Sequence, residues 1–78
     1  MAAPILYYWA PCGSCAKVVK FAEENGIELD KRDVEQVPPY NELLKLGGDA
    51  NLIPYLYDNG QLVQGVAACN AYLQEKYL

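Results

Sequence analysis

Residues 4–15 read Pro-Ile-Leu-Tyr-Tyr-Trp-Ala-Pro-Cys-Gly-Ser-Cys, and this stretch decides the fold. Its first half, residues 4–9, is short, apolar and aromatic and stops shortly before Pro11, a pattern typical of a strand buried on both faces. From Cys15 onward, apolar residues recur at helical spacing up to the Asn-Gly pair at 25–26, a common helix stop. The sequence therefore predicts a buried strand that runs directly into a helix, with two cysteines at the turn.

The middle of the chain predicts a second strand and a second helix. Residues 27–34 begin with apolar alternation and then turn polar, which favours a strand at or near a sheet edge. The proline pair at 38–39 opens a helix, and the glycine pair at 47–48 ends it. The apolar side of this helix is expected to consist of Leu43, Leu44 and Leu46.

The last third predicts a hairpin and a helix. Asn59-Gly60 separates the strand-like segments 55–58 and 61–64 and suits a type I′ turn, so these strands should be antiparallel neighbours. Residues 66–77 contain no helix breaker. The order is therefore β-α-β-α-β-β-α, with the first two strands parallel through a right-handed crossover. One face of the last helix carries Cys69, Tyr72 and Leu73.

The composition indicates a single globular domain. The chain has 78 residues, 53% of them hydrophobic and 21% charged, so we expect one folded domain over residues 1–78. The net charge is -4 and the basic residues are scattered, which excludes a basic face for nucleic acid. No apolar run reaches the roughly 18 residues of a membrane span, and residues 1–3 carry no basic or apolar signal segment. We expect a soluble, cytoplasmic protein that binds neither nucleic acid nor membrane.

One group of residues has catalytic character: Cys12-Gly13-Ser14-Cys15, at the turn from strand to helix. At a helix start, Cys12 meets unpaired backbone N–H groups and the positive end of the helix dipole, which favour the thiolate. Cys15 lies one turn deeper, close enough to resolve a mixed disulfide formed by Cys12. Gly13 and Ser14 are small and permit close approach of another chain or a tripeptide.

Other interpretations of the cysteines exist. A CxxC can be half of a zinc site, but zinc usually takes four ligands, and the chain has no histidine and only Cys69 as a further thiolate. The pair can also arise by chance, because cysteine serves as a small apolar residue. For Cys69, which shares a face with Tyr72 and Leu73, we expect a buried core thiol.

Ile53-Pro54 has two interpretations. A proline before a strand is ordinarily only a strand-entry residue. In a sheet of this order, however, it lies beside the CxxC turn, where a cis bond would aim the Ile53 backbone outward at an incoming peptide. Of the two aromatic residues before the motif, Tyr8 is expected in the core, whereas Trp9 can either shape a substrate surface or join the core.

These residues resemble the glutaredoxin branch of the thioredoxin superfamily over essentially the whole chain. The strand, the CGSC motif, Ile53-Pro54, the hairpin and the final helix follow that family in order and spacing. Residues 53–73 are also similar to the amino-terminal domain of glutathione transferases. The resemblance implies a thioredoxin fold of minimal glutaredoxin type, an α/β domain with a four-stranded mixed sheet and helices on both faces.

The resemblance also implies roles for individual residues. Cys12 is the nucleophile, Cys15 the resolving thiol and Pro54 the cis-proline, while the Ile53 backbone receives the cysteinyl part of glutathione. The acidic residue that glutaredoxins place after a Gly-Gly pair is absent from residues 64–68, as is the basic residue ahead of the first cysteine. Main-chain N–H groups at the last helix start can still receive a carboxylate. The remaining expected substrate-binding residues are Trp9, Pro11, Gly13, Ser14, Gly65 and Val66.

We therefore predict a dithiol glutaredoxin-type oxidoreductase that reduces protein or glutathione mixed disulfides. It requires no bound metal or organic cofactor, uses glutathione as co-substrate or thioredoxin reductase as electron donor, and is expected to be a monomer. One alternative is a carrier in which two chains bind an iron–sulfur cluster through Cys12 and external glutathione thiols. The others are a thioredoxin-reductase-dependent electron donor and a glutathione transferase-like binder without redox turnover.

Overall fold

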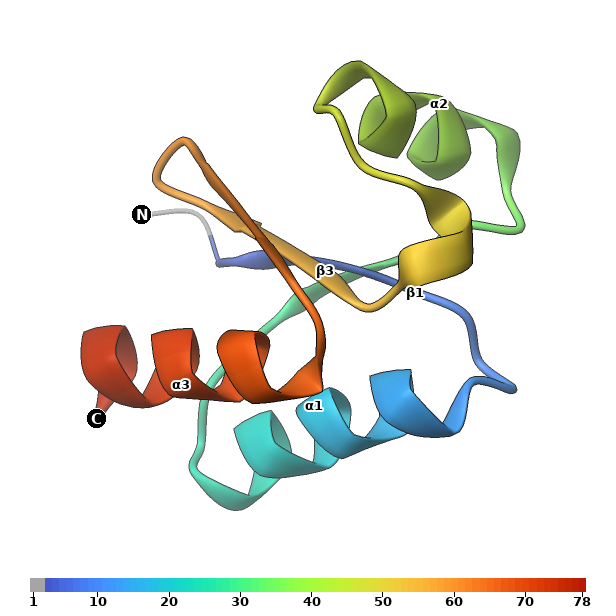
Figure 1. Cartoon of the computed structure of the whole chain (residues 1–78). Coiled ribbons are helices and arrows are strands. Elements are labelled where there is room, and N and C mark those ends of the chain that lie inside the picture. The colour runs from blue at the N-terminus through green and yellow to red at the C-terminus, as the bar shows by residue number, and fades with distance from the viewer. Residues whose placement is uncertain (1–2) are drawn as a thin grey trace.

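The computed structural model of the chain describes residues 3–78 and contains the predicted order of elements. Figure 1 shows a sheet with helices on both sides. In chain order the elements are β1 (Ile5–Tyr8), α1 (Gly13–Glu24), β2 (Asp30–Asp33), α2 (Val37–Lys45), the 3₁₀ turn η1 (Ala50–Leu52), β3 (Tyr55–Asp58), β4 (Gln61–Gln64) and α3 (Val66–Tyr77).

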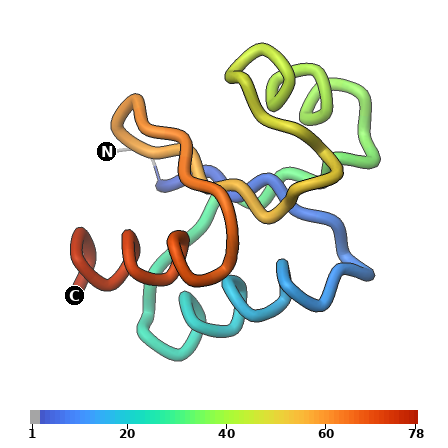
Figure 2. The backbone as a smooth tube through the Cα atoms, viewed as in Figure 1, coloured from blue at the N-terminus to red at the C-terminus, as the bar shows by residue number. Residues whose placement is uncertain are grey.

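The four strands form one mixed sheet in the order β2-β1-β3-β4. β1 pairs with β2 in parallel, and both β1–β3 and β3–β4 are antiparallel, as the sequence predicts. In the backbone trace, α1 and α3 run side by side beneath the sheet and α2 lies above it (Figure 2). The predicted edge position of the second strand is confirmed, and the α/β thioredoxin fold with helices on both faces is present.

Strand alternation divides the interior into two cores. Leu6 of β1 and Leu56 of β3 point to the side of the sheet that α1 and α3 cover. Their neighbours in the sequence, Tyr7 and Tyr55, point to the α2 side. The first core includes Val18, Ala22, Cys69, Tyr72 and Leu73. The second and smaller core is completed by Val34 and Leu43. Because both faces of β1 are buried, its apolar run is continuous rather than alternating, which is why the sequence reveals it so clearly.

Two expectations from the sequence need correction. Leu44 does not belong to the apolar side of α2, since it is 46% exposed. Successive helical residues point about 100° apart, so Leu43 faces the sheet and its neighbour faces solvent. The second strand is also shorter than the segment 27–34, because Ile27 and Leu29 pack against the first core from the loop before β2.

The predicted turn between β3 and β4 is confirmed. Asn59 has φ 50° and Gly60 has φ 77°, the two positive values that a type I′ hairpin requires. The hairpin is fastened to the end of α3, since the hydroxyls of Tyr72 and Tyr77 both donate to Oδ2 of Asp58, at 2.9 and 2.7 Å. This attachment joins the end of β3 to the second half of α3.

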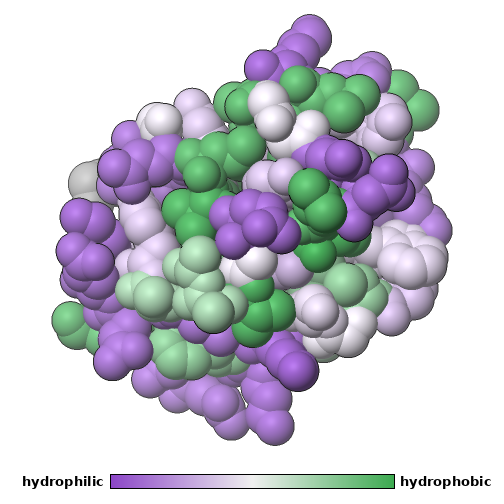
Figure 3. Space-filling view, in the orientation of Figure 1, coloured by the Kyte–Doolittle hydropathy of each residue, from purple (hydrophilic) through white to green (hydrophobic). Residues whose placement is uncertain are grey.

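The surface in the orientation of Figure 1 is mixed, with apolar residues interrupted by hydrophilic ones over the middle of the face (Figure 3). Leu52, in η1 shortly before β3, is 51% exposed. Within residues 3–78, no helix has the length and apolar character needed to cross a membrane.

Candidate active site

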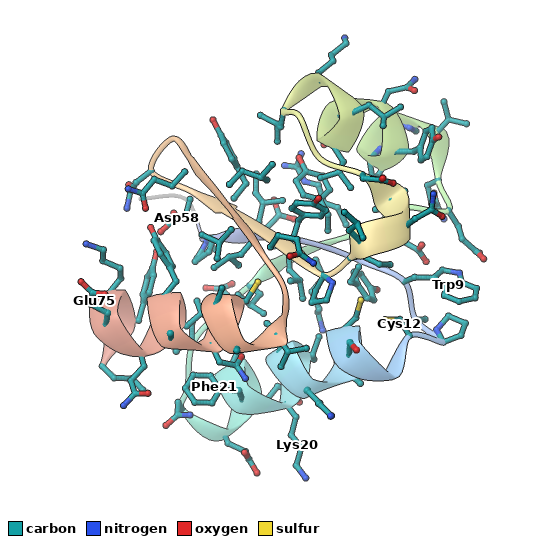
Figure 4. All side chains as sticks on the ribbon, in the orientation of Figure 1. Trp9, Cys12, Lys20, Phe21, Asp58 and Glu75 are labelled. Atoms are coloured by element: carbon teal, nitrogen blue, oxygen red, sulfur yellow. The ribbon has the colours of Figure 1, made fainter. Side chains whose placement is uncertain are left out.

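Cys12 lies at the turn between β1 and α1. Its backbone is extended, with φ −77° and ψ 118°, and it is the N-cap residue of α1. Its N–H donates to the carbonyl oxygen of Trp9 at 2.9 Å, which closes the turn that leads out of β1. The side chain is half-buried, and Figure 4 shows it beside Trp9 at the amino-terminal end of the helix.

The environment of Cys12 favours the thiolate. Partial burial by itself raises the pKa of this thiol, but hydrogen bonds from the backbone N–H of Cys15, from the Cys15 thiol and from the Ser14 backbone lower it, and the net shift is downward. The Cys15 N–H donates to Sγ of Cys12 at 3.4 Å, the geometry of a side-chain helix cap. A lowered pKa raises the fraction of Cys12 present as thiolate, which is the nucleophilic form of cysteine.

The environment of Cys15 is the opposite. Its side chain is 1% exposed, and burial is the main cause that raises its pKa to about 12. A hydrogen bond from the Trp9 backbone lowers this pKa, whereas the nearby sulfurs of Cys12 and Cys69 raise it. The motif therefore combines one half-buried thiol whose pKa is lowered with one buried thiol whose pKa is raised.

Ile53 and Pro54 lie at the same end of the sheet as the two cysteines. Register places Tyr55 opposite Tyr7, so the preceding Pro54 lies opposite Tyr8, immediately before the turn that carries Cys12. The Ile53–Pro54 peptide bond is cis, as the resemblance implies, and Pro54 is fully buried while Ile53 is half-buried. The sheet thus brings residues about forty positions apart to one end of the molecule.

The start of α3 borders the same site. The Gly65 N–H donates to the Pro54 carbonyl at 2.9 Å, and Gly65 has φ 96°, a conformation that favours glycine. Gln64 adds a second connection, since its side-chain nitrogen donates to the Leu52 carbonyl at 2.7 Å. Gly65 and Val66 are half-buried, and α3 begins there without a side-chain cap.

The remaining predicted site residues surround Cys12. Pro11, Gly13 and Ser14 are exposed next to it, so their backbone is accessible to another molecule. Cys69, in contrast, is a core thiol as expected: it is 0% exposed, and its burial raises its pKa to about 11. Its Sγ donates to the Val63 carbonyl at 3.5 Å and lies 4.0 Å from that of Pro54.

Two features near Cys12 are absent from the sequence-based prediction. The indole N–H of Trp9 donates to the carboxylate of Glu35, in the turn between β2 and α2. A groove of about 450 Å³ runs along the outer flank of α1 and begins at Tyr8 and Trp9. No local pattern signals a contact between residues 26 positions apart, so it appears only once β1 and β2 are paired.

Trp9 and Tyr8 occupy different environments. Trp9, for which the sequence allowed either a surface or a core position, is 37% exposed. Tyr8 is half-buried and packs against the first core, as expected. In the part of the chain that the structure describes, residues 3–78, no group of three or more His, Cys, Asp or Glu side chains is arranged to hold a metal ion.

The fold matches two kinds of solved structure. An unclassified glutathione S-transferase from Bombyx mori superposes with a TM-score of 0.83 at 26% identity over 97% of this chain and 36% of that one. The solution structure of a glutaredoxin from Brucella melitensis superposes with a TM-score of 0.69 at 22% identity, over 97% of this chain and 83% of that one.

Sequence comparison gives a family and one relative. The uncharacterized protein YusI of Bacillus subtilis (strain 168) is 40% identical over 42 residues, which are 53% of this chain and 36% of that protein. The chain thus spans about a third of the length of this relative and of the transferase. Residues 5–63 match the glutaredoxin family, and this match includes Cys12, Cys15 and Pro54. With its four-stranded fold and its dithiol at a helix start, the chain belongs to the glutaredoxin family.

Proposed function

We propose that this glutaredoxin-family domain is a dithiol oxidoreductase in which Cys12 attacks and Cys15 resolves. The observation that carries the proposal is the contrast between the two thiols: Sγ of Cys12 accepts the Cys15 N–H and has a lowered pKa, whereas Cys15 is 1% exposed with a pKa of about 12. A lowered pKa suits the nucleophile that attacks the substrate. A buried thiol with a raised pKa suits the residue that reacts only after a mixed disulfide has formed beside it.

The reaction proceeds through two exchanges. The Cys12 thiolate attacks one sulfur of a substrate disulfide, an S–S bond forms between them, and the other sulfur leaves as a thiolate that takes a proton from water. Cys15 then loses its proton and attacks Cys12, which releases the second substrate thiolate. Two electrons have moved from the cysteine pair to the substrate, and the pair is left as a Cys12–Cys15 disulfide.

We propose protein disulfides and glutathione mixed disulfides as substrates. Ile53 is half-buried at the end of the sheet where the Cys12 turn begins, and the carbonyl of Pro54 is already engaged by the Gly65 N–H, which holds the segment in place. The first N–H groups of α3, from Val66 on, are suited to a carboxylate because the helix start has no side-chain cap. The similarity of the fold to a glutathione S-transferase supports glutathione as a co-substrate.

A coupled assay tests the proposal. Reduction of a mixed disulfide is followed through NADPH consumption, with glutathione plus glutathione reductase in one reaction and thioredoxin reductase in the other. Turnover in the first identifies glutathione as the donor, and turnover in the second alone identifies the flavoprotein. Cys12→Ser should abolish activity in both, whereas Cys69→Ala, which removes a core thiol, should retain it. Full activity of Cys12→Ser would overturn the proposal.

A further inference from the structure

Trp9 is connected to both cysteines through its backbone. Its carbonyl oxygen accepts the Cys12 N–H at 2.9 Å. Its own backbone forms the hydrogen bond that lowers the pKa of Cys15 against the larger effect of burial. A displacement of Trp9 would therefore disturb the surroundings of both sulfur atoms.

The Trp9 side chain is held by a contact from another part of the chain. The indole is 37% exposed, so core packing alone does not fix it. Its N–H donates to the carboxylate of Glu35. Glu35 is itself well placed, because its N–H donates to Oδ1 of Asp33 at 2.8 Å and the adjacent Val34 N–H donates to the Tyr8 carbonyl at 2.9 Å. The β2–α2 turn is thus joined to β1 at its base and to the indole at its tip.

We propose that Glu35 is a positioning residue for the dithiol, which acts by holding the Trp9 indole and so fixing the turn from Trp9 to Cys12. In this position Sγ of Cys12 accepts the N–H of Cys15 at the start of α1. The inference deepens the proposed function, because it concerns the same two cysteines, but it can be tested without any disulfide substrate.

Charge and hydrogen bonding act in opposite directions here, which makes the proposal testable. A carboxylate such as that of Glu35 can only disfavour a thiolate through space, and it is not among the groups that lower the pKa of Cys12. Removing the Glu35 charge alone should therefore leave Cys12 as reactive or make it more reactive. Removing the hydrogen-bond acceptor should loosen the turn and make Cys12 less reactive.

The experiment measures the rate at which iodoacetamide alkylates Cys12 of the reduced full chain at neutral pH, with the modified residue identified by mass spectrometry. Glu35→Met, which removes the acceptor at similar size, should lower the rate about two- to five-fold, because the thiolate fraction falls tenfold per unit of pKa. Glu35→Gln retains an acceptor and should react at the native rate or faster. Glu28→Met, at an exposed glutamate in the loop before β2, serves as the matched control and should be unchanged.

A mutant cycle tests whether Glu35 acts through Trp9. Trp9→Phe keeps an aromatic ring but removes the N–H, so it should reproduce the Glu35→Met rate. The double variant should be no slower than either single variant. In a glutathione redox buffer, Glu35→Met should be more oxidised at equilibrium than the native chain, because its reduced form loses thiolate stabilisation. Equal thermal unfolding midpoints exclude general loss of structure as the cause.

Two results would overturn the inference: alkylation of Glu35→Met at or above the native rate, or alkylation of Glu35→Gln as slow as that of Glu35→Met. Failure of the proposed function has a different signature. In that case the native chain reduces no disulfide with either electron donor, while the alkylation rates of the Glu35 variants still report on the turn.

Discussion

The backbone N–H of Cys15 donates to Sγ of Cys12 at 3.4 Å, while the Cys15 side chain is 1% exposed. One residue therefore supplies both a hydrogen bond to the Cys12 sulfur and, in the proposed mechanism, the buried thiol that displaces the substrate. The arrangement follows from an i, i+3 spacing at a helix start, where the first N–H groups have no helical partner.

Alkylation should distinguish the two thiols by pH. Because the pKa of Cys12 is lowered, the reduced chain should be modified rapidly at Cys12 at neutral pH. Cys15, with a pKa of about 12 and a buried sulfur, should remain unmodified under the same conditions. Mass spectrometry after a short iodoacetamide pulse checks this, with denatured protein as the control in which all cysteines react. Equal labelling of Cys12 and Cys15 in the folded chain would contradict the assignment of roles.

Cys15→Ser should separate two activities. The variant retains the Cys12 nucleophile but has no resolving thiol, so reduction of a protein disulfide should fall by at least about tenfold as the mixed disulfide accumulates. Removal of glutathione from a glutathionylated peptide should persist, since external glutathione can resolve that intermediate. Both activities are compared with those of Cys12→Ser, which should have neither. Equal residual activity in the two variants would be inconsistent with the proposed mechanism.

The reduced chain should become less stable as the pH rises above about 9. Burial raises the pKa of Cys15 to about 12 and of Cys69 to about 11, from an ordinary thiol value of 9.0. In this range the unfolded chain has lost protons that the folded chain retains, so the free energy of unfolding falls with pH. The contribution of these two neutral thiols is complete below pH 9 and is lost toward pH 11 to 12. The pKa of Cys12 is lowered, so the ionisation of this thiol affects stability only at pH values below and around 9.0. There it makes the free energy of unfolding rise with pH.

Urea unfolding in a phosphine reductant measures this effect. The expected loss between about pH 9 and about pH 10 is roughly 1 to 2 kcal/mol, given about 1.4 kcal/mol for each group and pH unit. Three tyrosines also have raised pKa values, Tyr7, Tyr72 and Tyr77, but their ionisation lowers stability mainly above pH 10. The change between pH 9 and pH 10 is therefore due mainly to the thiols. Cys15→Ala and Cys69→Ala should each make the decline shallower. A free energy that stays constant or rises across the window would be evidence against neutral buried thiols.

Gly48→Ala should destabilise the fold through the second core. A Cβ atom at this position would lie 2.4 Å from Cδ1 and 2.8 Å from Cγ of Leu43, which is fully buried. Displacing a buried leucine should cost about 1 to 3 kcal/mol, measured by chemical unfolding. Leu43→Ala opens space at the same point, so the double variant should lose less than the sum of the single losses. Additive losses would show that the two positions do not compete for space.

Asp58→Ala should loosen the end of α3. Its Oδ2 accepts the hydroxyls of Tyr72 and Tyr77, so the variant loses two hydrogen bonds from the helix to the hairpin. We expect a loss of about 1 to 2 kcal/mol in the free energy of unfolding, and less for Tyr77→Phe, whose hydroxyl remains near water. Hydrogen exchange should rise first in the last turn of α3. Protection unchanged in Asp58→Ala would rule out this attachment.

Much of the fold is predictable because its signals are local. The apolar run before Pro11, the Asn59-Gly60 turn and the breaker-free segment 66–77 each specify a backbone conformation within a few residues. The order of these elements then limits the sheet topology. The same local information identifies Cys12 and Cys15, since a helix start and an i, i+3 spacing are properties of neighbouring residues.

Side-chain environments could not be predicted in the same way. Leu43 and Leu44 are adjacent residues of the same type. Only the packing of α2 against the sheet buries Leu43 and leaves Leu44 exposed. The sequence left Trp9 between core and surface because its hydrogen-bond partner, Glu35, belongs to a different turn. The contact exists because β1 and β2 are parallel neighbours that end at the same edge of the sheet.

By itself, then, the sequence determined the elements, their order and the position of the dithiol, because backbone preferences and helix capping act over a few residues. The tertiary structure decided which thiol is buried and what holds Trp9, and it placed Pro54, with Gly65 hydrogen-bonded to it, at the end of the sheet where the Cys12 turn begins. Burial and pKa depend on which atoms exclude water or donate hydrogen bonds, and those atoms come from segments that meet only when the sheet is formed.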